Sequence, residues 1–322
     1  MPAPNDGMTI AASWNALVNS KPEDNIFADY WLLNTLKQGE SFMSVAGGDV
    51  ITASLEYAQN GTVAFYSDTE TISTSRSDVF DRAEYSWKEV AGTVLQSELE
   101  DAINQGSAKK FDLLDAKLKN LKSTLDDTIN ASLFSDGTGT TGKEIGGLQL
   151  LIDPTPSTGT VGTINAATFS FWRNQQASGA QTASAFDNLR SSMRNIYNSS
   201  SNGMAGKHPR YAVTTQTVFQ GYEGLLLVNE RFTDKASADG GFKNETLKFK
   251  GAAMSYDGDC PSGTLYFYHP AFLKLAYLKG HWYKMTGPIR PANQTVDIYQ
   301  VSARCNLITT NRRMLGVVTV IT

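Results

Sequence analysis

The sequence predicts an α+β protein in which β-rich segments lie on both sides of one long helix. Three observations predict this class: a period-two pattern between residues 50 and 95, a helical period between 107 and 133, and further β-rich runs towards the C-terminus. Strands and helices do not alternate regularly, which argues against a doubly wound parallel sheet.

Composition limits the class of protein before any motif is considered. The 322 residues suffice for one large domain or two small ones. Hydrophobic residues make up 41% and charged residues 19%, so the chain can build a packed core. The net charge of −4 disfavours a dedicated nucleic-acid-binding surface. Apolar runs are only a few residues long and the N-terminus lacks a signal-peptide pattern, so we expect neither a membrane span nor secretion.

Residues 1–45 predict an N-terminal arm. Three prolines interrupt this segment, and the aromatic residues Trp14, Phe27, Tyr30 and Trp31 are scattered among polar ones. Exposed aromatic side chains on a terminal segment are typical of a surface that another molecule covers. The alternative is a short helix packed on the protein's own core, and the sequence favours neither.

The next segment predicts a long antiparallel excursion with a polar tip. Two β-rich runs, 50–55 and 62–66, flank Asn60-Gly61, a dipeptide that favours a tight hairpin turn. A polar stretch over 67–77 follows, and then a further β-rich run up to residue 95.

The same excursion is acidic. Between Gly47 and Trp87 there are seven acidic residues, two arginines and no lysine, a net charge of −5. We expect this loop to reach a basic surface on a neighbouring molecule, although an ordinary solvated surface is the simpler alternative. The candidate contact residues are Phe65, Tyr66, Asp78, Phe80, Asp81 and Glu84 on the loop, and Lys109, Lys110, Lys117, Lys119, Lys122, Arg312 and Arg313 on the basic side.

Residues 107–133 predict one long helix. Apolar residues recur in steps of three and four, and Ser135-Asp136-Gly137 provides a stop. A helix of this length extends about 40 Å, so its single apolar stripe needs an extended partner surface. A coiled coil is the alternative. The stripe consists of Phe111, Leu114, Leu118, Leu121, Leu125, Ile129 and Leu133.

Gly137–Lys143 matches glycine-rich phosphate-binding patterns. Those patterns require a strand before the loop and a helix after it, whereas here a long helix precedes the loop. Glu144 also replaces the Ser or Thr that would hold magnesium. We therefore favour a linker, and we keep a nucleotide-binding enzyme as an alternative.

The other reactive residues indicate no catalytic or metal site. Three histidines, His208, His269 and His281, show no ligand spacing, and Cys305 alternates with core residues while Cys260 lies in a turn. We expect no cofactor, and the sequence leaves open whether the cysteines pair. The remaining predicted elements are a helix over 185–198, strands over 208–213, 247–256, 264–268, 299–307 and 314–321, and a helix or strand over 218–228.

Several local stretches resemble one known family. They are Ile145–Leu148, Gly159–Asn165, Trp172–Asn174, Phe249–Ala252 and Pro261–Phe267. Together with the order of parts, they resemble the major capsid protein of tailed bacteriophages, which has the Hong Kong 97-like fold.

The resemblance implies a domain organisation. It assigns 1–45 to the N-terminal arm, 46–95 to the extended loop, 96–143 to a peripheral domain with the spine helix, 144–278 to an axial domain, and 279–322 to returning strands that complete both sheets.

The resemblance also implies a function. The chain would be a structural protein, not an enzyme, that assembles as hexamers and pentamers into an icosahedral shell. Its partners would be further copies of itself, a separate scaffolding protein, a portal, a decoration protein and packaged double-stranded DNA contacted non-specifically. It would be made in the bacterial host cytoplasm and reside in the virion. Some relatives crosslink through a loop lysine, which this loop lacks. A bacterial nanocompartment shell of the encapsulin type is the rival.

Overall fold

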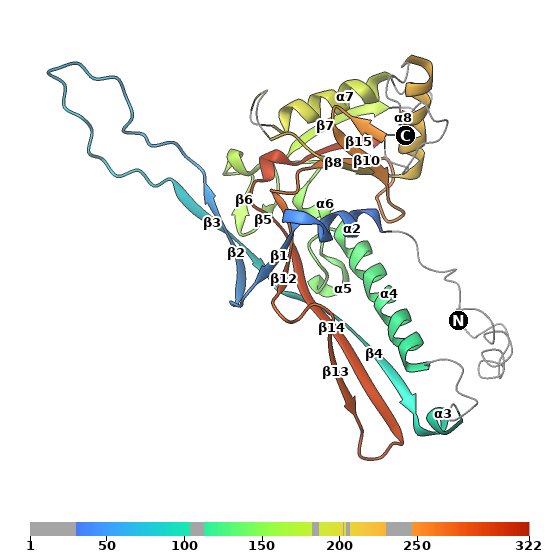
Figure 1. Cartoon of the computed structure of the whole chain (residues 1–322). Coiled ribbons are helices and arrows are strands. Elements are labelled where there is room, and N and C mark those ends of the chain that lie inside the picture. The colour runs from blue at the N-terminus through green and yellow to red at the C-terminus, as the bar shows by residue number, and fades with distance from the viewer. Residues whose placement is uncertain are drawn as a thin grey trace. The chain divides into compact units, whose positions relative to one another are not determined.

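The computed structural model describes residues 30–103, 113–181, 187–201, 203, 207–229 and 247–321. The chain forms two compact units. Figure 1 shows the helices and strands with their labels. Among the described residues, the first unit comprises stretches within Ala91–Asp127 and Tyr283–Ser302, and the second comprises stretches within Tyr30–Val90, Thr128–Trp282 and Ala303–Thr322.

A six-stranded sheet in the second unit forms the main core. Its strand order is β7-β15-β11-β8-β10-β9. Helix α7 contacts β7 and β15, and Gly316 allows this approach, since a Cβ there would lie 2.4 Å from Ile196 Cγ2. The strands are β7 (Gln175–Gln181), β8 (Tyr211–Thr214), β9 (Leu247–Phe249), β10 (Ala252–Tyr256), β11 (Leu265–Tyr268) and β15 (Gly316–Ile321), and the helices are α7 (Asp187–Ser199) and α8 (Gln216–Asn229).

One detail of this core differs from the sequence-based prediction, and another decides between two alternatives that the sequence left open. The run 247–256, predicted as one strand, is the hairpin β9–β10, because Lys250 and Gly251 adopt φ values of 48° and 93° and make a tight turn. The ambiguous run 218–228 is helical and lies within α8. Its buried Val218 and Tyr222 are four residues apart and face the same core cluster.

A five-stranded sheet is organised around β14, the longest strand. In the second unit β14 pairs with β12, which pairs with β1, and in the first unit it pairs with β13. The predicted strand over 299–307 lies within β14, and its alternation holds as far as Cys305, whereas Asn306 is buried like its neighbours. Strand β4 also pairs with β14. The bounds are β1 (Phe42–Val45), β4 (Lys88–Ser97), β12 (Leu273–Leu278), β13 (Lys284–Ile289) and β14 (Val296–Thr309).

The predicted long helix is present as α4, Leu113–Phe134, after a short helix α3, Glu98–Ile103. Its predicted start at Ser107 lies outside the described residues. The apolar stripe is buried at its C-terminal end, whereas Leu118 and Leu121 are half-buried. Gly92 of β4 allows close contact with Leu121, because a Cβ there would lie 2.5 Å from Leu121 Cδ1.

Short elements complete the described structure. Within the described residues, no helix combines the length and apolarity needed to cross a membrane. The remaining elements are α2 (Trp31–Lys37), α5 (Gly139–Gly142), α6 (Leu148–Leu151), β2 (Val50–Glu56), β3 (Phe80–Ser86), β5 (Thr160–Val161), β6 (Ile164–Asn165), and 3-10 turns at Gly39–Ser41, Ser170–Trp172 and Arg312–Met314.

Candidate assembly surface

The β2–β3 hairpin projects away from the rest of the second unit (Figure 1). The strands pair antiparallel over seven residues, from Val50 opposite Ser86 to Glu56 opposite Phe80. At the base, alternate β2 side chains are buried and the intervening ones are exposed, as expected for a strand with one covered face. The hairpin therefore has an anchored base and a free end.

Hydrogen bonds and close packing hold the base. The Glu84 amide donates to the Gly162 carbonyl at 3.0 Å, and the Tyr85 hydroxyl donates to the Thr309 carbonyl at 3.0 Å. Gly162 has φ of 58°, and a Cβ there would lie only 2.8 Å from the Ala83 Cβ. This position thus requires glycine for both its backbone conformation and the contact.

The expected tight hairpin at Asn60-Gly61 is wrong. The partner of β2 is β3, and residues 62–66 form no strand. Asn60 instead caps a local turn, because its Oδ1 accepts hydrogen bonds from the amide and hydroxyl of Thr62, at 3.0 and 2.8 Å. The connection between the strands is therefore a long loop over 57–79, which we call the tip loop.

The tip loop exposes large apolar side chains. Val63 is 81% exposed, Phe65 is fully exposed, and Phe80, at the start of β3, is 75% exposed. The Tyr66 hydroxyl links parts of the loop, because it donates to the Thr62 carbonyl at 2.9 Å and accepts from the Ser73 amide at 3.4 Å. Apolar exposure on this scale in a projecting segment is typical of an interface with another molecule.

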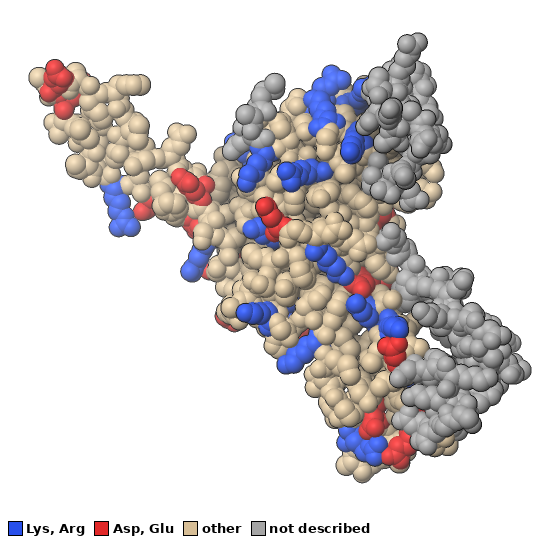
Figure 2. All heavy atoms as spheres, viewed as in Figure 1, with Lys and Arg blue, Asp and Glu red and all other residues tan. Residues whose placement is uncertain are grey.

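The acidic character of the hairpin is partly neutralised within the hairpin itself. Arg76 pairs with Asp78 at 3.4 Å, and Arg82 pairs with Glu84 at 2.8 Å. Figure 2 shows acidic side chains at the far end of the projection. The acidic tip loop residues outside these pairs are Asp68 and Glu70.

The proposed arm divides at residue 30. Trp14 and Phe27 lie outside the described residues. The stretch 31–37 is the helix α2, whose leucines are buried in the second unit, and the Trp31 ring packs edge-on against Tyr211 at 5.9 Å. For α2 the alternative of a helix on the protein's own core is correct, because its leucines gain cover within the chain. Tyr30 is half-buried, and its backbone carbonyl accepts a hydrogen bond from the Asn34 amide at 3.0 Å at the start of this helix.

Arg312 is not a surface residue, which corrects its assignment to a docking surface. Its side chain is fully buried, and Nε donates to the Leu151 carbonyl at 2.8 Å while Nη1 donates to the Trp172 carbonyl at 3.3 Å. Burial lowers the pKa of this guanidinium. Arg313 is exposed, as expected. The dipeptide alone could not separate the two residues, since only the tertiary fold decides which one points inward.

The helix lysines are also largely engaged. Lys117 pairs with Glu100 at 2.7 Å and thereby lowers the pKa of that carboxyl, and Lys119 pairs with Asp115. The Lys122 ammonium lies 5.8 Å from the centre of the Tyr283 ring. Lys109 and Lys110 lie outside the described residues.

The glycine-rich loop does not have the form of a phosphate cradle. Thr140 and Thr141 adopt left-handed φ values of 46° and 60°, so α5 is an irregular turn and not a regular helix. The Glu144 carboxylate lies over Gly139 and accepts the Thr140 hydroxyl at 2.9 Å. A carboxylate therefore occupies the place where a phosphate would need positive charge.

Asp257 serves as a structural connector. Its carboxylate accepts the Leu32 amide at 3.2 Å and the Asn130 side-chain amide at 2.9 Å, and the same Asn130 nitrogen donates to Asp259 at 2.7 Å. Burial raises the pKa of Asp257. These contacts join α2, α4 and the turn after β10.

The cysteines and histidines show no reactive grouping. Cys260 and Cys305 are both free and buried, which answers the question that the sequence left open. Among the described residues, no cluster of three or more His, Cys, Asp or Glu side chains could hold a metal ion.

Similarity to solved structures extends over nearly the whole chain. The capsid asymmetric unit of cyanophage A-1(L) is similar with a TM-score of 0.67 and 17% identity, covering 96% of this chain and 98% of that chain. The capsid of a native GTA particle is similar with a TM-score of 0.59 and 12% identity, covering 97% and 98%. The holo-SrpI encapsulin complex from Synechococcus elongatus PCC 7942 is similar with a TM-score of 0.55 and 13% identity, covering 97% and 95%.

These similarities confirm the predicted α+β, Hong Kong 97-like fold. No family model and no curated protein matches the sequence. At such low identities the likeness establishes the fold, and function has to be argued from the surface described above.

Proposed function

We propose that this chain is the major capsid protein of a tailed bacteriophage, which assembles with copies of itself into the icosahedral shell around the genome. The observation that carries the proposal is the exposed tip loop on a chain with a capsid fold. Five of the ten large hydrophobic residues exposed among the described residues are Val63, Phe65, Tyr66, Ile72 and Phe80.

A second chain explains this exposure physically. Removing apolar surface from water contributes roughly 25 cal/mol per Å². Among the described residues, Val63, Phe65 and Ile72 of the tip loop are exposed. A shell supplies a neighbour for every copy, so the same hairpin would be buried many times over. Hexamers and pentamers of the chain are the assemblies expected for such a shell.

The other partners belong to the same proposal. We expect a scaffolding protein, a portal, a decoration protein and packaged double-stranded DNA to contact the shell, which would reside in the virion after synthesis in the bacterial host cytoplasm. We propose a structural role without catalysis, and the Glu144 carboxylate over the glycine-rich loop supports that view.

A nanocompartment shell is the second candidate. The similarity to the SrpI encapsulin complex favours it specifically, although with a lower TM-score than the cyanophage capsid. The two functions differ in what the shell contains, which is DNA in one case and protein cargo in the other.

Electron microscopy and sedimentation of the purified protein test assembly directly. We expect closed shells, sheets or tubes, or rings of five or six subunits. A stable 35.0 kDa monomer under every condition, including with scaffolding protein added, would contradict the proposal. Nuclease treatment and mass spectrometry of particles from infected or expressing cells then distinguish packaged DNA from enzyme cargo.

A further inference from the structure

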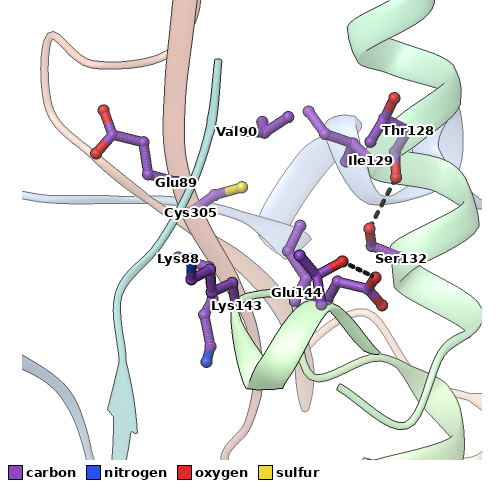
Figure 3. Close-up of a pocket in the computed structure, with 11 residues that line it drawn as sticks. Lys88, Glu89, Val90, Thr128, Ile129, Ser132, Lys143, Glu144 and Cys305 are labelled. Carbon is purple, nitrogen blue, oxygen red and sulfur yellow. Dashed lines mark hydrogen bonds between the residues drawn. The ribbon is translucent and has the colours of Figure 1, made fainter. Parts of the chain in front are cut away.

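The second unit contains a pocket of about 270 Å³ that has not been assigned a role above. It lies among the first residues of β4, the C-terminal part of α4, the glycine-rich loop and β14, and Figure 3 shows its lining. Ile129, Ile145 and Cys305 are buried apolar members of that lining, and Val90 is half-buried. The interior is thus large and apolar enough for a hydrophobic side chain.

The pocket also carries a positive rim. The Lys88 ammonium donates to the Gly142 carbonyl, which places it beside Lys143. Lys143 is exposed and forms no ion pair with the residues that the structure describes. Of the two acids of the rim, Glu89 pairs with Arg304 at 3.1 Å, whereas Glu144 accepts a hydroxyl and keeps its negative charge. With Lys88 and Lys143 the rim still carries more positive than negative charge.

We propose that this pocket receives the tip loop of a second copy of the chain, with Phe65 in the apolar interior and Asp68 and Glu70 against Lys143 and Lys88. The inference rests on the proposed function, since it needs a neighbouring copy. Size and charge both support it. A cavity of ~150 Å³ accommodates a benzene ring, so the pocket has room for the ring of Phe65.

The spacing along the tip loop fits this arrangement. Asp68 follows Phe65 by three residues, which corresponds to about 10 Å of extended chain. That length is similar to the separation expected between the interior of such a pocket and its rim. The Glu70 carboxylate accepts the Ser67 amide at 3.0 Å, so its position relative to the ring is fixed by the loop itself. Arg76, the cation of the tip loop, is paired with Asp78 and leaves the acids beside Phe65 unneutralised.

Zero-length crosslinking of assembled wild-type protein tests the contact. A carbodiimide joins a carboxyl group to an amine as an amide with loss of the elements of water. We expect peptides that join Asp68 or Glu70 to Lys143 or Lys88, found in multimers on a denaturing gel. The matched control is Lys143→Arg with Lys88→Arg, which keeps both charges and should assemble but lose these crosslinks.

Charge reversal provides a second measurement that does not depend on crosslinking yield. Lys143→Glu should raise the protein concentration needed for assembly by about fivefold, since one surface ion pair contributes up to ~1 kcal/mol. Adding Asp68→Lys alone should restore assembly, because it returns an opposite charge to the reversed position while Glu70 and Lys88 keep theirs. Lys279→Glu, an exposed lysine elsewhere in the second unit, makes the same charge change and should have no effect.

The outcomes separate this inference from the proposed function. Crosslinks that map to other lysines would overturn the pocket assignment and leave the capsid proposal standing. Assembly of Lys143→Glu at the wild-type concentration would do the same. Absence of any assembly by the wild-type protein would overturn both. If no carboxyl–lysine crosslink forms at all, the charge-reversal series alone decides.

Discussion

The six-stranded sheet and the β2–β3 hairpin contain similar residues that differ in burial. Phe267 in β11 is fully buried, and Phe80 in β3 is 75% exposed. Both lie in strands with regular antiparallel pairing. The sheet is covered by α7 and α8 of the same chain, whereas at the outer end of the hairpin Val63, Phe65 and Phe80 are exposed among the described residues.

This difference identifies the region in which the chain depends on other molecules. Backbone pairing satisfies the hydrogen-bonding groups in both regions, so pairing alone does not distinguish them. Burial of apolar area does distinguish them, because most apolar side chains of the sheet are buried and those at the outer end of the hairpin are exposed. We therefore expect mutations in the sheet to affect folding and mutations in the tip loop to affect association.

The largest expected effect is Phe267→Ala in the sheet. Loss of a buried phenyl ring should destabilise the subunit by ~3–5 kcal/mol, a large part of a typical domain's stability. Thermal or urea unfolding followed by circular dichroism measures this change. Phe80→Ala, the same substitution in the hairpin, is the matched control and should change the unfolding free energy by less than ~0.5 kcal/mol. Equal losses of stability in both variants would show that the hairpin ring contributes to folding as much as the sheet ring does.

Phe65→Ala with Phe80→Ala should impair assembly and leave folding intact. Both rings are exposed in the single chain, so their removal takes nothing from its core. Sedimentation should show more unassembled subunit at a given concentration, with an unchanged circular dichroism spectrum. Normal shells from this double variant would mean that the hairpin acts through its backbone alone.

Reversal of Asp68, Glu70 and Asp81 to lysine should weaken association moderately. Asp78 and Glu84 are poorer choices than we expected from the sequence, since each pairs with an arginine of the hairpin. Surface ion pairs contribute ~0–1 kcal/mol each, and salt screens them. Raising the salt concentration should shift the wild-type protein in the same direction. Light scattering at several salt concentrations measures both, and assembly that is independent of salt would contradict an electrostatic role.

The two cysteines should be unreactive in the folded subunit. Burial raises the pKa of Cys260 and of Cys305 to about 12, so at pH 8 both remain protonated thiols, which are poor nucleophiles. Iodoacetamide at pH 8 should modify neither thiol in native protein and both in denaturant. Mass spectrometry counts the adducts, and rapid native labelling would show that one of these core positions opens.

At the end of this scale, we expect no covalent multimers on a denaturing gel of mature particles. No lysine lies between Gly47 and Trp87, so we expect no lysine-dependent crosslink from the hairpin. Boiled and reduced particles should run as a single band near 35.0 kDa. A ladder of multimers would show covalent bonds between subunits and would refute a purely noncovalent shell.

Much of the local structure follows from the sequence. The stripe over 107–133 predicted α4, and the alternation over 299–307 predicted β14. Both are long periodic patterns, and in such segments one face of the element must be apolar whatever it packs against. The acidic and polar character of the excursion could also be predicted, because charge and polarity depend only on composition.

The tertiary structure decided the rest. Asn60-Gly61 favours a tight turn locally, yet β2 pairs with a strand 24 residues further on, at Phe80. Arg312 and Arg313 are adjacent and chemically identical, yet one is buried and the other exposed. Strand pairing and side-chain burial depend on residues far away in the chain, here Gly162 beneath the hairpin and the Leu151 and Trp172 carbonyls around Arg312, and no local pattern encodes those partners.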